Sequence, residues 1–278
     1  MIFVFALLLL LVYMLGVRAH NARHYKPIDA WQIAFFIVGV LLIALALSTP
    51  IDELVDRSFA AHMTQHLVLA MVVPPLLLLG APLRLALTAS PAPIARRLAR
   101  MLHSRVVHAL TQPALAWCSF VVVMWATHFS GLYEAALEND AVHVGEHALF
   151  LGAALLFWYP IVGIGPTTHP LSHIGRLLYV LVAMPQGAFL GLAIYGSRRV
   201  LYHNYLLISN PFGVSALEDQ RIGGELMWIA GTLIMFVALL LVIANWARDD
   251  ARVAQRIDTR LALATDYFLD SRFGERQP

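Results

Sequence analysis

The sequence is poor in charged residues and in cysteine. Only 13% of its 278 residues are Asp, Glu, Lys or Arg, which is about half the share found in water-soluble domains. The single cysteine, Cys118, lies inside an apolar run and excludes an intrachain disulfide. Apolar residues make up 60% of the chain and the mean hydropathy is +0.72. These values exclude an ordinary soluble domain and predict a polytopic membrane protein.

The N-terminus also lacks the features of a cleavable signal peptide. No basic residue precedes the first apolar run, and no small-residue cleavage site follows it. We therefore expect residues 1–17 to be retained as a membrane span.

Seven apolar segments are each about long enough to cross a hydrocarbon core of roughly 30 Å. The predicted spans are residues 1–17, 30–48, 59–80, 112–129, 141–163, 174–195 and 221–246. The predicted fold is therefore all-α, a polytopic membrane helix bundle of about seven transmembrane helices. We expect this transmembrane domain to occupy residues 1–247 and a cytoplasmic amphipathic tail to occupy residues 248–278.

The tail alternates charged residues with Val253, Ile257 and Leu261. This pattern predicts a helix that lies on the surface of the protein or of the membrane. The arginine-rich stretch 81–111 is expected to behave in the same way.

The charges of the loops predict the orientation of the bundle. Arginines gather after the first, third and seventh spans, whereas acidic residues gather after the second and fourth. By the positive-inside rule, the N-terminus lies outside and the C-terminus is cytoplasmic. The loop after the sixth span is an exception, because it carries Arg198 and Arg199.

Two pairs of histidines begin two of the predicted spans. His62 and His66 open the third span, and His143 and His147 open the fifth. Residues four apart share a helix face, so each pair points in one direction. His128 ends the fourth span at the same membrane face. At 1.5 Å per residue, all five imidazoles are expected within roughly 10 Å of the outer interface.

Ionisable groups inside spans are costly unless they have partners, and they usually mark functional sites. Neutral imidazole binds copper, zinc and iron, while Met63 or Met227 would add a soft thioether that favours Cu(I). Glu146 shares a face with His143 and can bind a metal or orient an imidazole. The predicted metal ligands are His62, His66, His128, His143, His147, Glu146 and Met227. Tyr202 and Tyr205 are expected to be interfacial aromatics.

Five stretches of the sequence are distinctive when taken together. They are H-M-T-Q-H-L-V-L-A-M-V-V-P-P-L-L-L-L-G-A-P-L-R (62–84), T-H-F-S-G-L-Y-E-A-A-L (127–137), V-H-V-G-E-H-A-L-F-L-G-A-A-L-L-F-W (142–158), P-Q-G-A-F-L-G (185–191) and D-Q-R-I-G-G-E-L-M-W (219–228). In this order they resemble the Bacillus-type CtaG family of cytochrome c oxidase assembly factors, which are integral membrane proteins linked to copper supply.

The resemblance implies a protein of the bacterial plasma membrane that is not an enzyme and supports the assembly of a haem–copper oxidase. Copper is the implied metal. Oxidase subunits and copper donor proteins are the implied partners, beside membrane lipid and without nucleic acid. By matching position, the candidate functional histidines are His62, His66, His128, His143 and His147.

Other functions remain open at this point. The sequence His143-Val-Gly-Glu146-His147 matches H-x-x-E-H, a zinc peptidase pattern in which the glutamate is the general base. Such a site needs a further ligand and an aqueous cleft, and Glu225 is the tempting carboxylate. A haem-b protein with one histidine from each pair is another alternative.

Overall fold

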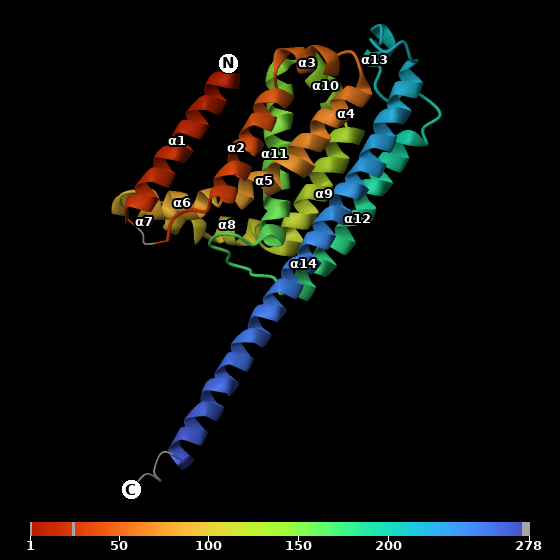
Figure 1. The fold of residues 1–278 in the computed structure, drawn as a ribbon. Coiled ribbons are helices and arrows are strands. Elements are labelled where there is room, and N and C mark those ends of the chain that lie inside the picture. Colours follow the sequence, from red (N-terminus) through yellow and green to blue (C-terminus); the bar gives the residue numbers. More distant parts are fainter. Residues whose placement is uncertain (1, 24–25, 274–278) are drawn as a thin grey trace.

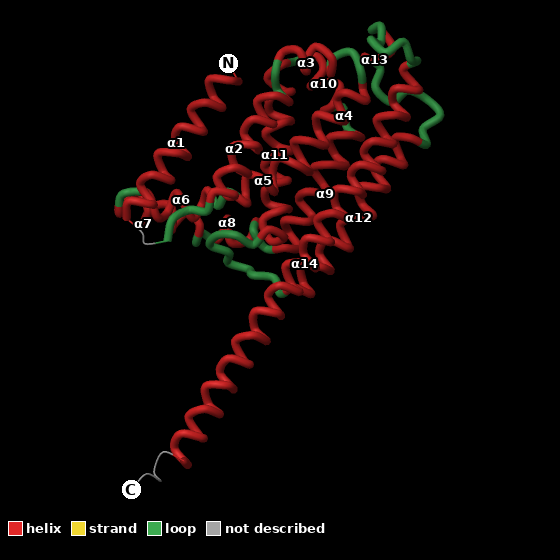
Figure 2. The backbone as a smooth tube through the Cα atoms, viewed as in Figure 1, coloured by secondary structure: helices red, strands yellow, loops and turns green. Residues whose placement is uncertain are grey.

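The computed structural model describes residues 2–23 and 26–273, and these residues form a bundle of α-helices (Figure 1). They contain no β-strand (Figure 2), so the all-α prediction is confirmed for this part of the chain. Residue 1, which opens the first predicted span, and residues 274–278, which end the predicted tail, lie outside the described residues.

Five stretches are long and apolar enough to cross a membrane. Four of them are the single helices α1 (Ile2–Arg23), α11 (Asp140–Val162), α12 (His173–Tyr195) and α14 (Ala216–Phe273). The fifth stretch, Phe59–Ala89, is composed of α4 (Phe59–Leu67), a π-helical turn η1 (Val68–Val72), α5 (Val73–Leu79) and α6 (Pro82–Ala89).

Two further candidate spans are bent. Helix α2 (Ala30–Ala46) meets α3 (Thr49–Val55) at 55°, and α9 (Pro113–Phe129) meets α10 (Leu132–Glu138) at 65°. Counted as one span each, they raise the number of candidate spans to seven, at the places that hydropathy predicts.

The outer surface of the bundle is apolar, as lipid contact requires. Leu7, Val122 and Leu233 are each more than 60% exposed. In water such side chains would carry a large hydrophobic cost, whereas lipid tails are as apolar as leucine. The surface therefore suits a membrane environment.

The third span is the central element of the bundle. Its first part, α4, packs against α14, and α5 packs against α2 and α11. Pro74 has no N–H, so it cannot complete the helical hydrogen bond to the carbonyl of Ala70. The chain adopts a π-helical turn just before this proline, and the indole Nε1 of Trp158 donates to the Ala70 carbonyl at 3.0 Å. Trp158 of α11 therefore donates the hydrogen bond that Pro74 cannot donate. This contact joins the two spans that carry the histidine pairs.

Helix α14 includes most of the predicted tail, and its direction differs from the one that the sequence predicts. It runs without a break past residue 247 and projects away from the bundle (Figure 1), whereas the sequence pattern predicts a tail that lies on a surface. Between Thr232 and Phe273 there is no glycine or proline to end the helix. Loss of hydropathy after residue 246 marks the end of the apolar segment and not the end of the helix.

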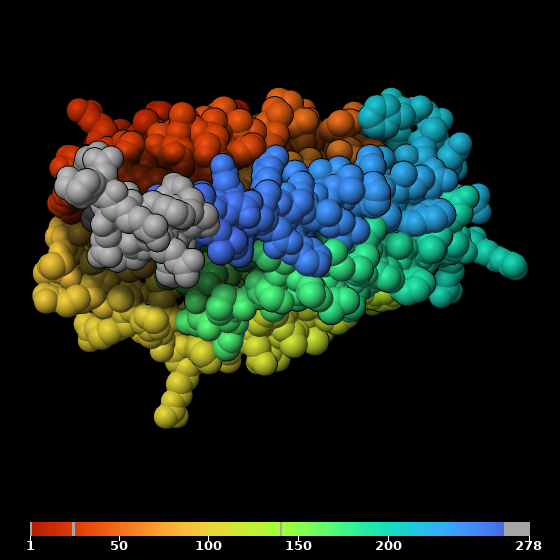
Figure 3. Space-filling model, turned by 60° about the horizontal axis from the view of Figure 1, so that its bottom comes forward, coloured from red at the N-terminus to blue at the C-terminus, as the bar shows by residue number. Residues whose placement is uncertain are grey.

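The arginine-rich stretch 81–111 forms three short helices, not one. They are α6, α7 (Ala92–Leu102) and α8 (Arg105–Leu110). They lie at the end of the bundle from which α14 projects (Figures 1 and 3). The opposite end carries α3, α10 and the short α13 (Asn204–Leu207).

Candidate metal centre

The first histidine pair lies on α4 and faces the interior of the bundle. His62 is fully buried and His66 is 2% exposed. Their Nε2 atoms are 2.9 Å apart, a hydrogen-bond distance that requires one proton between two nitrogens. A metal ion that took the place of this proton would find two imidazole lone pairs already directed toward each other.

The second pair, on α11, faces the first. The ring centroids of His143 and His62 are 5.4 Å apart, and those of His147 and His66 are also 5.4 Å apart. Glu146 approaches the first pair as well, with its Oε2 atom 4.0 Å from Nε2 of His66. The structure therefore brings these five predicted ligands together from two spans.

Two compact ligand sets overlap in this cluster. His62, His143 and His147 form one set, while His62, His66 and Glu146 form the other. Within each set the donor atoms all lie within 4.8 Å of one another. His62 belongs to both sets, which places it at the centre of the site.

Several donor atoms of the cluster are buried without a hydrogen-bond partner among the described residues. They include Nε2 of His143 and His147 and both carboxylate oxygens of Glu146. Each unsatisfied buried polar atom costs about 1–3 kcal/mol. Copper, zinc and iron all accept imidazole, and zinc and iron also accept carboxylate, so the residues present fit a metal ion.

His128 lies at the edge of the cluster and outside both compact sets. Its Nδ1 atom is 2.7 Å from the carbonyl oxygen of Met124. A carbonyl only accepts, so Nδ1 carries the proton and Nε2 keeps a lone pair. That Nε2 atom is buried without a hydrogen-bond partner in the part of the chain that the structure describes. The ring faces that of His66 at a centroid distance of 6.1 Å.

Two of the other sequence candidates lie apart from the donor sets. Met227 is buried and lines a cavity together with Met63 and His66, so it borders the cluster on the side of His66. Glu225 belongs to neither compact set of the described residues.

Two tyrosines that sequence reasoning missed orient His62. The hydroxyls of Tyr133 and Tyr205 lie 2.9 and 3.1 Å from its Nδ1 atom, and 3.1 Å from each other. Tyr205 donates its own proton to the carbonyl of Val55, and burial raises the pKa of Tyr205 far above its usual value. The two tyrosines hold the His62 ring so that its Nε2 atom faces His66. Tyr205 is therefore part of the site and not a plain interfacial aromatic.

Asp219, at the start of α14, fixes the beginning of α4. Its carboxylate accepts hydrogen bonds from the backbone N–H groups of Phe59 and Ala60, at 2.6 and 3.3 Å, and from the hydroxyl of Ser58 at 2.9 Å. A carboxylate at a helix N-terminus also interacts favourably with the helix dipole. Sequence analysis assigns no role to Asp219, although this residue opens the stretch 219–228.

Glycines in the same stretch allow α14 to approach its neighbours closely. A Cβ atom at Gly223 would lie 2.5 Å from the ring of Phe59, and one at Gly224 would lie 2.8 Å from the carbonyl oxygen of Gly191 on α12. Both contacts are too short for any larger residue without movement. The glycines therefore set how closely α14 packs against the helix that carries the first histidine pair.

Comparison with known proteins gives a consistent result. Residues 11–249 match the family described as cytochrome c oxidase caa3 assembly factor. Uncharacterised proteins of Mycobacterium bovis and Mycobacterium tuberculosis are each 34% identical to this chain over 255 residues, and one of Mycobacterium leprae is 29% identical over 250. These matches cover 87–88% of this chain but only 38–39% of the relatives, so the chain spans about two fifths of their length. No solved structure matches.

Proposed function

The chain belongs to the cytochrome c oxidase caa3 assembly factor family, and we propose that it binds copper at the histidine cluster and supports metallation of the oxidase. The proposal rests on one observation: two histidine pairs from separate spans lie side by side. They form two donor sets that share His62, and the donor atoms of each set lie within 4.8 Å of one another. Copper is the cargo in this proposal, and the protein acts as an assembly factor without a catalytic residue.

The chemistry of the cluster supports copper. Neutral imidazoles bind both copper oxidation states, and the neighbouring thioethers of Met63 and Met227 favour Cu(I). The carboxylate that Glu146 forms on binding the ion would balance the single charge of Cu(I), which lowers the cost of holding the ion away from water. His62, His66, His143, His147 and Glu146 would hold the ion, and His128 would border it.

The charge distribution supports an outward-facing site. The cluster lies toward the end of the bundle that carries α3 and α10, and the arginine-rich helices α6–α8 lie at the opposite end (Figure 1). By the positive-inside rule, the basic end is cytoplasmic in a bacterial plasma membrane. Copper would then be handled on the extracytoplasmic side, with a copper donor protein and haem–copper oxidase subunits as partners, and the C-terminal helix would lie in the cytoplasm.

A zinc enzyme is the second candidate, and one observation favours it. His62 supplies the third ligand that the H-x-x-E-H pattern of His143, Glu146 and His147 requires. However, His62 and Glu146 are 0% and 2% exposed, and hydrolysis of a peptide needs an aqueous cleft at the metal. A haem is less well supported, because the cavity beside the cluster has a volume of about 50 Å³, far smaller than a haem.

Metal analysis of the detergent-purified protein and its Glu146→Gln variant tests the proposal. We expect copper in the wild type and copper affinity about 10- to 100-fold lower in the variant, because the carboxylate either binds the ion or orients a ligand. Glu138→Gln is the matched control, since Glu138 is exposed. Zinc in the wild type that persists in Glu146→Gln would support the enzyme, in which the general base is not a ligand.

A further inference from the structure

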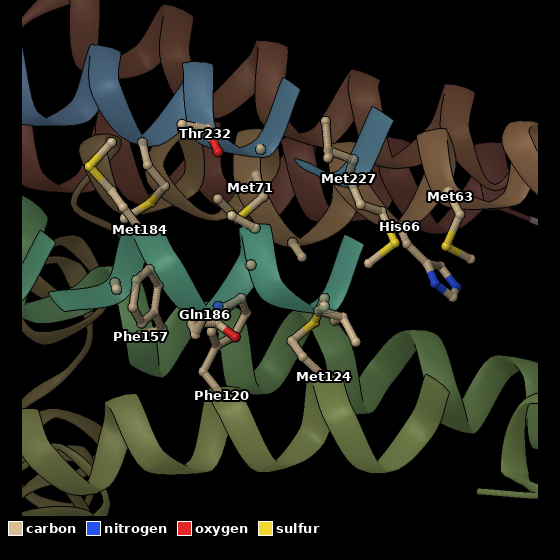
Figure 4. Close-up of a pocket in the computed structure, with 18 residues that line it drawn as sticks. Met63, His66, Met71, Phe120, Met124, Phe157, Met184, Gln186, Met227 and Thr232 are labelled. Carbon is tan, nitrogen blue, oxygen red and sulfur yellow. The ribbon is translucent and has the colours of Figure 1, made fainter. Parts of the chain in front are cut away.

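A small cavity lies beside the histidine cluster, and its lining residues come from the third span and from α9, α11, α12 and α14 (Figure 4). It has a volume of about 50 Å³, and His66 forms part of its wall. Six of the nine methionines of the sequence line it. They are Met63, Met71, Met124, Met184, Met227 and Met235.

The methionines come from separate elements and extend away from the cluster. Met63 and Met71 belong to the third span, Met124 to α9, Met184 to α12, and Met227 and Met235 to α14. Met227 and Met235 are eight residues apart, which corresponds to about 12 Å along a helix. The lining thus reaches from the level of His66 toward the middle of the bundle (Figure 4).

Packing alone does not account for this concentration of thioethers. Methionine commonly fills irregular gaps in a core, because its side chain is unbranched and adaptable. Here the methionines surround a space that they leave open. A packing role would favour side chains that close such a cavity, since voids cost stability.

Two polar atoms at the cavity point to an occupant. Oε1 of Gln186 and Oγ1 of Thr232 are buried without a hydrogen-bond partner among the described residues, and both residues line the cavity. Wholly apolar cavities stay dry, whereas polar ones hold water. A volume of about 50 Å³ admits an ion with a few waters.

We propose that the methionine-lined cavity is a second copper site, selective for Cu(I), that exchanges the ion with the histidine cluster through His66. The inference rests on the proposed copper function and adds the oxidation state and a second location. Thioether sulfur is a soft ligand that selects Cu(I) over Zn²⁺ and Cu²⁺. Because His66 borders both sites, the ion can pass between them without entering lipid, and no redox step is needed.

The test loads the purified protein with Cu(I) under reducing conditions, and separately with Ag(I) as a redox-inert probe. Bound metal is counted, and its ligands are identified by X-ray absorption. The variant is Met71→Leu/Met184→Leu/Met235→Leu, in which volume is nearly conserved. The control is Met14→Leu/Met101→Leu, because both of these methionines are exposed and lie outside the cavity.

We expect sulfur scattering from the wild type and from the control. The triple variant should show weaker sulfur scattering, because only Met63, Met124 and Met227 of the lining methionines remain, and it should bind less metal, while copper bound through nitrogen remains. Nitrogen ligands alone in the wild type, or unchanged sulfur scattering in the triple variant, would overturn the second site but leave the histidine site standing. Absence of bound copper in the wild type would overturn both proposals. If the triple variant fails to fold, Met71→Leu alone is compared in the same way.

Discussion

His66→Ala and His147→Ala are each expected to abolish copper-dependent oxidase assembly in cells while the protein still inserts into the membrane. The two residues come from different spans and face each other at 5.4 Å. Even the partners of metal ligands contribute about 10- to 100-fold to metal affinity, so removal of a ligand should cost about 100-fold or more. Alanine is a good helix former, and the spans should persist.

The measurement is oxidase activity of membranes from cells that carry each variant, together with immunodetection of the protein. His103→Ala is the control, because His103 is exposed at the opposite end of the bundle. Oxidase activity that is unchanged in both cluster variants, at normal protein levels, would count against copper handling by this site.

Asp219→Ala is expected to lower the free energy of unfolding by about 3 kcal/mol and to disturb the metal centre. The change leaves the N–H groups of Phe59 and Ala60 and the hydroxyl of Ser58 without their acceptor. Loss of a helix cap costs up to about 2 kcal/mol, and each unsatisfied buried donor costs about 1–3 kcal/mol. Because α4 carries His62 and His66, fraying of its first turn should also reduce copper binding.

Thermal unfolding in detergent and copper content measure these two effects. Asp219→Asn should show a smaller loss, since the amide keeps one oxygen acceptor. Asp258→Ala, an exposed position on the same helix, should behave as the wild type does. An unchanged melting temperature in Asp219→Ala would show that the carboxylate does not hold the helix.

The sequence predicted well those features that depend on local periodicity. Hydropathy located the spans, and the four-residue spacing of His62 and His66 placed both on one face. Hydropathy located the end of the last apolar segment but not the end of α14. A helix continues through charged residues when no glycine or proline intervenes.

Features that depend on long-range contacts could not be read from local pattern. Tyr133 reaches His62 because the chain bends by 65° after α9, and hydropathy carries no information on such a bend. Asp219 caps a helix that begins 160 residues earlier. Both lie within stretches that carry the family resemblance.

The most direct test of the account is the copper content of three purified proteins: wild type, His62→Ala/His66→Ala and His143→Ala/His147→Ala. If the two spans share one histidine site, each double variant loses all of the copper that is bound through nitrogen. Retention of that copper in either double variant would contradict a shared site, because one pair would then bind the ion without the other.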